Sequence, residues 1–220
     1  MSDFPLLVAN LKANKSWDEM SAWIEEVGKN AQGYPGTIVV CPTLPFLSAA
    51  KQKIDQEGLK ITLGSQDVSA FEAGPYTGEV AASQIVGLCE YAIVGHSERR
   101  GNFKEDEDTL EKKVKNTLAA GLKPIYCVPD ENSPIPEGTG IVAFEPIAAI
   151  GTGEPDSPQN AQRVASVIKS NGQHTVIYGG SVNAQNARAF LKEDIIDGLL
   201  VGTDSLESAK FIAIIEAISL

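Results

Sequence analysis

Eight short apolar runs recur along the chain, and turn-forming or polar residues bound each of them. The runs are PLLVAN (5–10), TIVVC (37–41), KITLG (60–64), YAIVG (91–95), PIYCV (124–128), IVAFE (141–145), TVIYG (175–179) and DGLLVG (197–202). They do not alternate apolar with polar residues, and such runs are typical of strands buried on both faces. The pattern therefore predicts eight strands, each covered on two sides.

Amphipathic segments with helical spacing separate most of these runs. The first has apolar residues at Met20, Trp23, Ile24, Val27 and Ala31, which is the stripe of a helix packed on a core. A second repeats at Leu110, Val114 and Leu118, behind an acidic first turn. A third begins at Ser157-Pro158, an N-cap followed by a first-turn proline, and runs to about residue 170. Strand and helix are therefore predicted to alternate along the whole chain.

Eight strands in alternation with helices favour a closed (β/α)8 barrel, and an open doubly wound sheet is the alternative. We expect one barrel domain over residues 1–220. Such barrels typically have about 250 residues, so part of the architecture should be reduced. Between Val128 and Ile141 the sequence PDENSPIPEGTG contains three prolines, which break helices. We expect an extended segment there in place of one crossover helix.

Composition narrows the class of function. The 220 residues include 18 Lys+Arg and 29 Asp+Glu, for a net charge of −11, and 43% are hydrophobic. The acidic excess argues against nucleic acid as a partner, although a small anion could bind at one local site. No apolar run approaches about 18 residues and the N-terminus lacks the pattern of a signal peptide, so we expect no membrane segment and a cytoplasmic protein. The three cysteines, an odd number without a CxxC pair, are expected to be reduced and buried.

Polar residues and glycines follow several strands directly. They are Asn10, Lys12, His96, Glu145, Gly151, Gly153, Gly179 to Ser181, and Gly202. In a barrel these positions would face one mouth, where active sites lie. Taken singly, each has an ordinary structural explanation, such as a solvated lysine or a turn glycine. His96 differs from His174, at a strand beginning, because the SERRG segment after it could open a helical turn whose N–H groups point back at the imidazole.

Around these positions the sequence resembles the triosephosphate isomerase family. The matching motifs are YAIVGHSERRGNF (91–103), FEPIAAIGTG (144–153), YGGSV (178–182), DGLLVG (197–202), NLK (10–12), GSQDV (64–68) and YTGEV (76–80). They occur in the family's order and cover nearly the whole chain. The resemblance implies a barrel enzyme of glycolysis and gluconeogenesis that interconverts dihydroxyacetone phosphate and glyceraldehyde 3-phosphate through an enediolate, with no cofactor or metal.

Carried over position by position, the resemblance implies a role for each site residue. Glu145 matches the base, His96 the neutral electrophile, Lys12 the catalytic lysine, and Asn10 the asparagine beside them. The positions that match the phosphate site are Gly151, Gly180, Ser181, Gly202 and Thr203.

The resemblance also implies a homodimer. The segment SAFEAGPYTGE (69–79) is similar to a long loop that inserts beside the active site of a second subunit. Thr77 would then reach toward Asn10 of the partner subunit and Glu98 of the partner subunit, with Gln66 supporting the loop.

Three departures from the family pattern lie close to the site. Ala148 stands where the family usually has a tryptophan in the first hinge of a closing lid, PIAAIGTGEPDSP. Pro129-Asp130 replaces a Gly-Glu pair, whose glutamate partners that tryptophan, and Thr203 replaces a second glycine. Two other functions therefore stay open, a barrel that binds a triose phosphate without turnover and a different phosphosugar isomerase. The intact catalytic residues weigh against the first, and GHSERRG weighs against the second.

Overall fold

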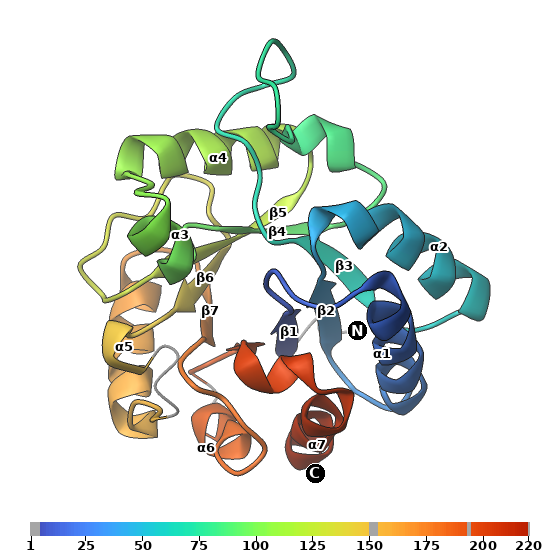
Figure 1. Ribbon diagram of the computed structural model, residues 1–220. Helices are drawn as coiled ribbons and strands as arrows, with labels where there is room; N and C mark the ends of the chain where they lie inside the picture. The colour runs from blue at the N-terminus through green and yellow to red at the C-terminus, as the bar shows by residue number, and fades with distance from the viewer. Residues whose placement is uncertain (1–4, 150–153, 193–194, 220) are drawn as a thin grey trace.

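The protein forms a closed barrel of eight parallel strands surrounded by helices (Figure 1). This computed structural model describes residues 5–149, 154–192 and 195–219. The strands are β1 (Leu6–Asn10), β2 (Thr37–Cys41), β3 (Thr62–Ser65), β4 (Tyr91–Val94), β5 (Lys123–Val128), β6 (Ile141–Phe144), β7 (Thr175–Tyr178) and β8 (Gly198–Val201). Each pairs with its neighbour in sequence, and β8 pairs with β1, which closes the barrel. All eight predicted strands are confirmed, and the open sheet is excluded.

Helices cover the outside of the barrel. The α-helices are α1 (Trp17–Asn30), α2 (Leu47–Glu57), α3 (Ser97–Asn102), α4 (Glu107–Ala119), α5 (Pro158–Ser170), α6 (Ala187–Leu191) and α7 (Ser208–Ser219). Short 3₁₀ helices are η1 (Leu44–Phe46), η2 (Ala82–Ile85), η3 (Ile147–Ala149) and η4 (Thr203–Leu206). The three predicted helices are present, and the Ser157 side chain caps α5 as expected. Among the described residues, no helix combines the length and apolar character that crossing a membrane requires.

Two hydrophobic layers hold the barrel together. Alternate strand residues, such as Val8, Ile93 and Ile177, form an inner cluster, and the residues between them pack outward against the helices. Strand β3 contributes Gly64 to the crowded interior, where a Cβ would come within 2.7 Å of the Cys41 sulfur. The layers leave the ends of the strands as the place where polar side chains converge.

The connection between β5 and β6 contains no helix, as the sequence predicts. Every residue from 129 to 140 is described, and none of them is helical. Ile135 packs on the outer core, and Glu131 forms an ion pair of 2.6 Å with Arg163 of α5. Gly138 has φ +80°, and a Cβ there would lie 2.8 Å from Cδ1 of Leu118. Leu118, the last apolar residue of the α4 repeat, is consequently 37% exposed rather than buried.

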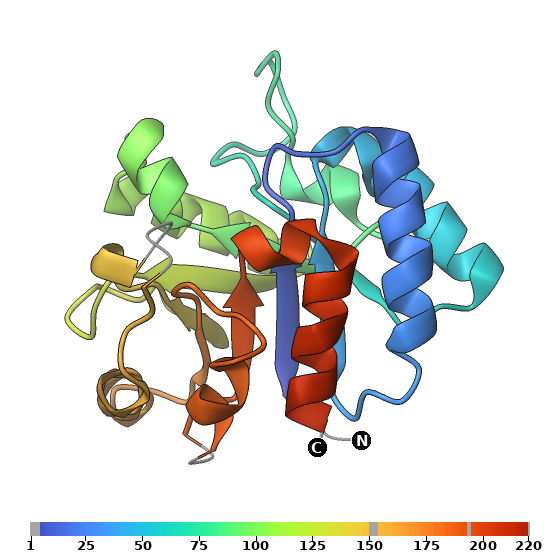
Figure 2. The same cartoon turned by 60° about the horizontal axis from the view of Figure 1, so that its bottom comes forward.

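The connection between β3 and β4 corrects the prediction of strict alternation. Its residues, 66–90, are all described and contain only the 3₁₀ helix η2. The part before η2, which includes residues 69–79, projects beyond the ring of helices (Figures 1 and 2). The Phe71 and Tyr76 rings stack there with centroids 4.2 Å apart, and both are more than 40% exposed. The segment is rich in Gly and polar residues and lacks a helical apolar repeat, so no amphipathic helix forms.

Candidate active site

Three strands present the polar side chains predicted for the barrel mouth. Asn10 ends β1, with Lys12 two residues later, while His96 follows β4 and Glu145 follows β6. Nε2 of His96 lies 3.1 Å from Oε1 of Glu145. The structure thus brings residues nearly 50 positions apart in the sequence into direct contact.

The state of the His96 ring follows from the start of α3. His96 is the N-cap residue of this helix, and its Nδ1 accepts a hydrogen bond of 3.2 Å from the Glu98 backbone N–H. A ring nitrogen that accepts a hydrogen bond carries no proton, so this pattern assigns the neutral tautomer with its proton on Nε2. The expected helical turn behind the imidazole is therefore present. His174, in contrast, uses Nδ1 to contact the Thr139 carbonyl at 3.0 Å, at the opposite end of the strands.

Glu145 is buried and held from two sides. Its Oε2 accepts a hydrogen bond of 3.0 Å from the Ser97 backbone N–H, and its side chain is 3% exposed. The positive end of α3 favours a carboxylate at this place. Burial raises the pKa of the neighbouring Cys127 thiol, and the Glu145 carboxylate adds to the rise. Cys127 therefore stays a neutral, apolar neighbour of the carboxylate.

Lys12 is held in an unusual backbone conformation, with φ +53°. Its backbone N–H donates to Oδ1 of Asn10 at 3.1 Å, and its carbonyl accepts from Nε2 of Gln66 at 2.8 Å. Its ammonium group forms an ion pair of 2.6 Å with Glu98. Positive φ costs a non-glycine residue energy, which these three contacts offset.

Sequence reasoning missed the contacts that Gln66 and Glu98 make within one subunit. It placed Gln66 under the projecting segment and assigned Glu98 to a second subunit. The available signal was the position of Glu98 in the first helical turn after His96, which faces the same mouth.

Two loops carry the residues predicted to bind phosphate. Gly180 follows β7, and a Cβ there would collide with the Tyr178 hydroxyl and with Ala149. Ser181 has φ +47°, and its hydroxyl donates to the Ala149 carbonyl at 2.5 Å. This bond ties the loop after β7 to the segment after Glu145.

The loop after β8 is tighter than expected. Gly202 lies against Lys12, because a Cβ there would come 3.4 Å from the lysine Cε. The helix expected after Gly202 is the single 3₁₀ turn η4, which begins at Thr203. Gly151, the remaining predicted phosphate residue, lies outside the described residues.

Comparison with known proteins gives a consistent result. A family model described as triosephosphate isomerase matches residues 5–139 and 133–218, so its two segments meet in the β5–β6 connection. The triosephosphate isomerase of Aquifex aeolicus is 36% identical over 244 residues, covering 96% of this chain and 98% of the relative. That of Hahella chejuensis is 34% identical over 244 residues, covering 96% and 97%. That of Colwellia psychrerythraea is 38% identical over 209 residues, covering 79% and 82%.

The barrel, its mouth and the His–Glu contact define an enzyme of the (β/α)8 class with a site suited to proton transfer. The comparisons narrow the class further. The chain belongs to the triosephosphate isomerase family. Two of the alignments extend over 244 residues, more than the 220 of this chain, so those relatives carry residues that this chain lacks.

Proposed function

We propose that the protein interconverts dihydroxyacetone phosphate and D-glyceraldehyde 3-phosphate by proton transfer between adjacent carbons. The observation that carries the proposal is the contact between Glu145 and a neutral His96. The reaction needs a base for a carbon-bound proton and a donor for the substrate oxygen. A carboxylate and an imidazole N–H supply these two groups side by side.

In this mechanism Glu145 removes a proton from one carbon and returns it to the next. The C–H electron pair becomes the double bond of an enediolate, while the carbonyl oxygen gains negative charge. His96 donates its Nε2 proton toward that oxygen and so limits the build-up of charge. A Glu base and a neutral His electrophile are known for this family, and the present geometry supports the same assignment here.

Lys12 and Asn10 support the charge that develops. The Lys12 ammonium group contacts Glu98 and Asn10 fixes the lysine backbone, so a cation stands at the mouth in a set orientation. A cation fixed before the reaction stabilises an oxyanion without reorganising in the transition state.

The phosphate group is assigned to Gly180, Ser181, Gly202 and Thr203, together with Gly151. Positive φ at Ser181 and the absence of a side chain at Gly180 and Gly202 let backbone amides approach an anion closely. Threonine at 203 is exposed and begins η4.

An assay of purified protein tests this function. Dihydroxyacetone phosphate production is followed with a coupled glycerol-phosphate dehydrogenase, and binding of 2-phosphoglycolate is measured by calorimetry. Turnover together with inhibitor binding supports the proposal. Inhibitor binding without turnover would instead support a binding protein, for which the altered residues Ala148 and Asp130 beside the site speak. Turnover of a different phosphosugar only would favour the third alternative.

We further propose that the protein is a homodimer formed through residues 69–79. The exposed Phe71–Tyr76 stack gives this projecting segment a preformed apolar tip, and a two-fold contact is the commonest kind of oligomer. Thr77 would lie near Asn10 of the partner subunit and Glu98 of the partner subunit. Light scattering at micromolar concentration should give twice the chain mass, and Tyr76→Asp should reduce it. An active monomer at that concentration would contradict the proposal.

We also propose a cytoplasmic location. The three cysteines are free and buried, as is usual in a reducing compartment. Cell fractionation with an antibody against the protein tests it.

A further inference from the structure

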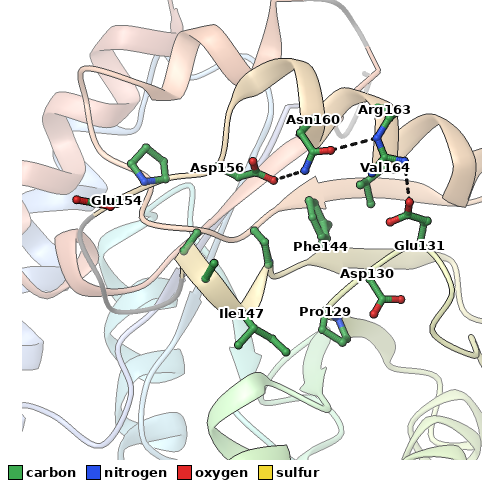
Figure 3. Close-up of a pocket in the computed structure, with 14 residues that line it drawn as sticks. Pro129, Asp130, Glu131, Phe144, Ile147, Glu154, Asp156, Asn160, Arg163 and Val164 are labelled. Carbon is green, nitrogen blue, oxygen red and sulfur yellow. Dashed lines mark hydrogen bonds and ion pairs between the residues drawn. The ribbon is translucent and has the colours of Figure 1, made fainter.

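A hollow of about 490 Å³ lies on the outer side of β6 (Figure 3). It is bounded by the start of the β5–β6 connection, by η3 and by one face of α5. Phe144, Pro146, Ala148 and Val164 give it apolar walls. Its volume falls within the range of about 300–1,000 Å³ that is usual for sites of small organic molecules.

The hollow is a product of the missing crossover helix. Asn160, Arg163 and Val164 line it from α5 at helical spacing, which is the face that a neighbouring helix would cover. The connection closes only part of this face, through the Glu131–Arg163 ion pair. The small side chain of Ala148 leaves the remaining space open.

Negative charge without a matching cation surrounds this apolar space. Asp130 lies on the side of the connection and Asp156 on the side of α5 (Figure 3). Asp130 accepts hydrogen bonds from the Asn132 N–H and the Ser133 hydroxyl. Asp156 accepts from the Ser157 N–H and the side-chain amide of Asn160. All these donors are neutral, and in the described part of the chain neither carboxylate has an ion pair.

The one guanidinium group in the wall does not change this balance. Arg163 is bound to Glu131 at 2.6 Å and to the Asn160 side-chain oxygen at 3.1 Å. Its charge is therefore matched by a carboxylate of its own. The two aspartates remain as unmatched charges on opposite sides of the hollow.

We propose that the hollow is a binding site for a small organic cation with a ring-sized apolar body, of the arylalkylamine type. The body fills the space against Phe144, Pro146 and Val164, and the ammonium group lies between the two aspartates. Asn10, Lys12 and His96 do not line this hollow. The proposal therefore does not rest on the isomerase function.

Three probes that share an indole ring and differ in charge test the ligand class. Tryptamine is cationic, tryptophol is neutral and indole-3-acetate is anionic. Their dissociation constants are measured by titration of ¹⁵N-labelled protein, with the amides of Phe144 and Val164 as reporters. Two partly exposed ion pairs should favour tryptamine over tryptophol by about tenfold, with indole-3-acetate weakest. Equal affinity for the amine and the alcohol, or no saturable binding of the amine, would overturn the proposal.

Variants locate the site. The isosteric double variant Asp130→Asn/Asp156→Asn should lose the preference for tryptamine over tryptophol. The control Glu72→Gln/Asp108→Asn removes the same charge from distant exposed positions and should keep it. Ala148→Trp should fill the hollow and abolish binding of all three probes, and if this variant does not fold, the amide variant decides. A preference that persists without the two aspartates would place the amine elsewhere and refute the site.

Discussion

Replacement of Glu145 by glutamine tests the proposed base most directly. In the structure both carboxylate oxygens face donors, the Ser97 N–H at 3.0 Å and His96 Nε2 at 3.1 Å. Glutamine keeps the shape but has only one oxygen. Whichever way the amide turns, its NH₂ group faces an N–H group, and such an unmade hydrogen bond costs about 1–3 kcal/mol when it is buried.

Two losses therefore add in the Glu145→Gln variant. An amide cannot accept a carbon-bound proton, and base catalysis contributes on the order of 10²–10⁴-fold to rate. The conflict with the His96 N–H also disturbs the second catalytic group. We expect kcat to fall by at least about a hundredfold, with the larger end of the range favoured by the disturbed histidine.

The measurements separate chemistry from binding. The coupled isomerase assay gives kcat, and calorimetry with 2-phosphoglycolate should show retained binding, because the phosphate loops are unchanged. The chain has only two histidines, so the ¹⁵N imidazole spectrum should show one altered ring. Glu216→Gln, on the exposed side of α7, is the control and should behave as the unaltered protein. Turnover within tenfold of the unaltered protein would refute Glu145 as the base.

Three further predictions concern the altered surroundings of the site and the stability of the barrel. Ala148→Trp should lower activity or stability because the indole N–H lacks a partner, Asp130→Glu should recover part of the loss, and a coupling energy near zero in the double-mutant cycle would show that the two positions are independent. Gly138→Ala should lower the free energy of unfolding by about 1 kcal/mol or more, owing to positive φ and the close approach of Leu118, as measured by urea denaturation; an unchanged midpoint would contradict this. Burial raises the pKa of Tyr178 to about 12, so the folded state keeps a proton that the unfolded chain loses near 10; stability should fall as pH rises through this window, and Tyr178→Phe should flatten the loss.

Much of the fold could be predicted because barrel strands are buried on both faces. Runs such as TVIYG and IVAFE contain no polar alternation, and their ends mark the mouth of the barrel directly. The prolines between Val128 and Ile141 likewise announce a connection without a helix, since proline removes the backbone donors that a helix needs.

The remaining features depend on contacts between distant parts of the chain. The Lys12–Glu98 ion pair joins residues 86 positions apart, and no local pattern indicates it. The same is true of the bond from Ser97 to Glu145 and of the two carbonyls, Lys12 and Cys41, that Gln66 binds. The hollow beside β6 could not be foreseen because it is formed by what three separate segments leave unfilled.

The β5–β6 connection also bears on how small such a barrel can be made. Twelve residues separate Val128 from Ile141, close to the shortest length that joins neighbouring parallel strands. One apolar contact at Ile135 and one ion pair at Glu131 secure it, while β5 and β6 keep four paired positions. For protein engineers, a barrel crossover is thus a tether defined by its reach and its anchors, and its helix is a replaceable module.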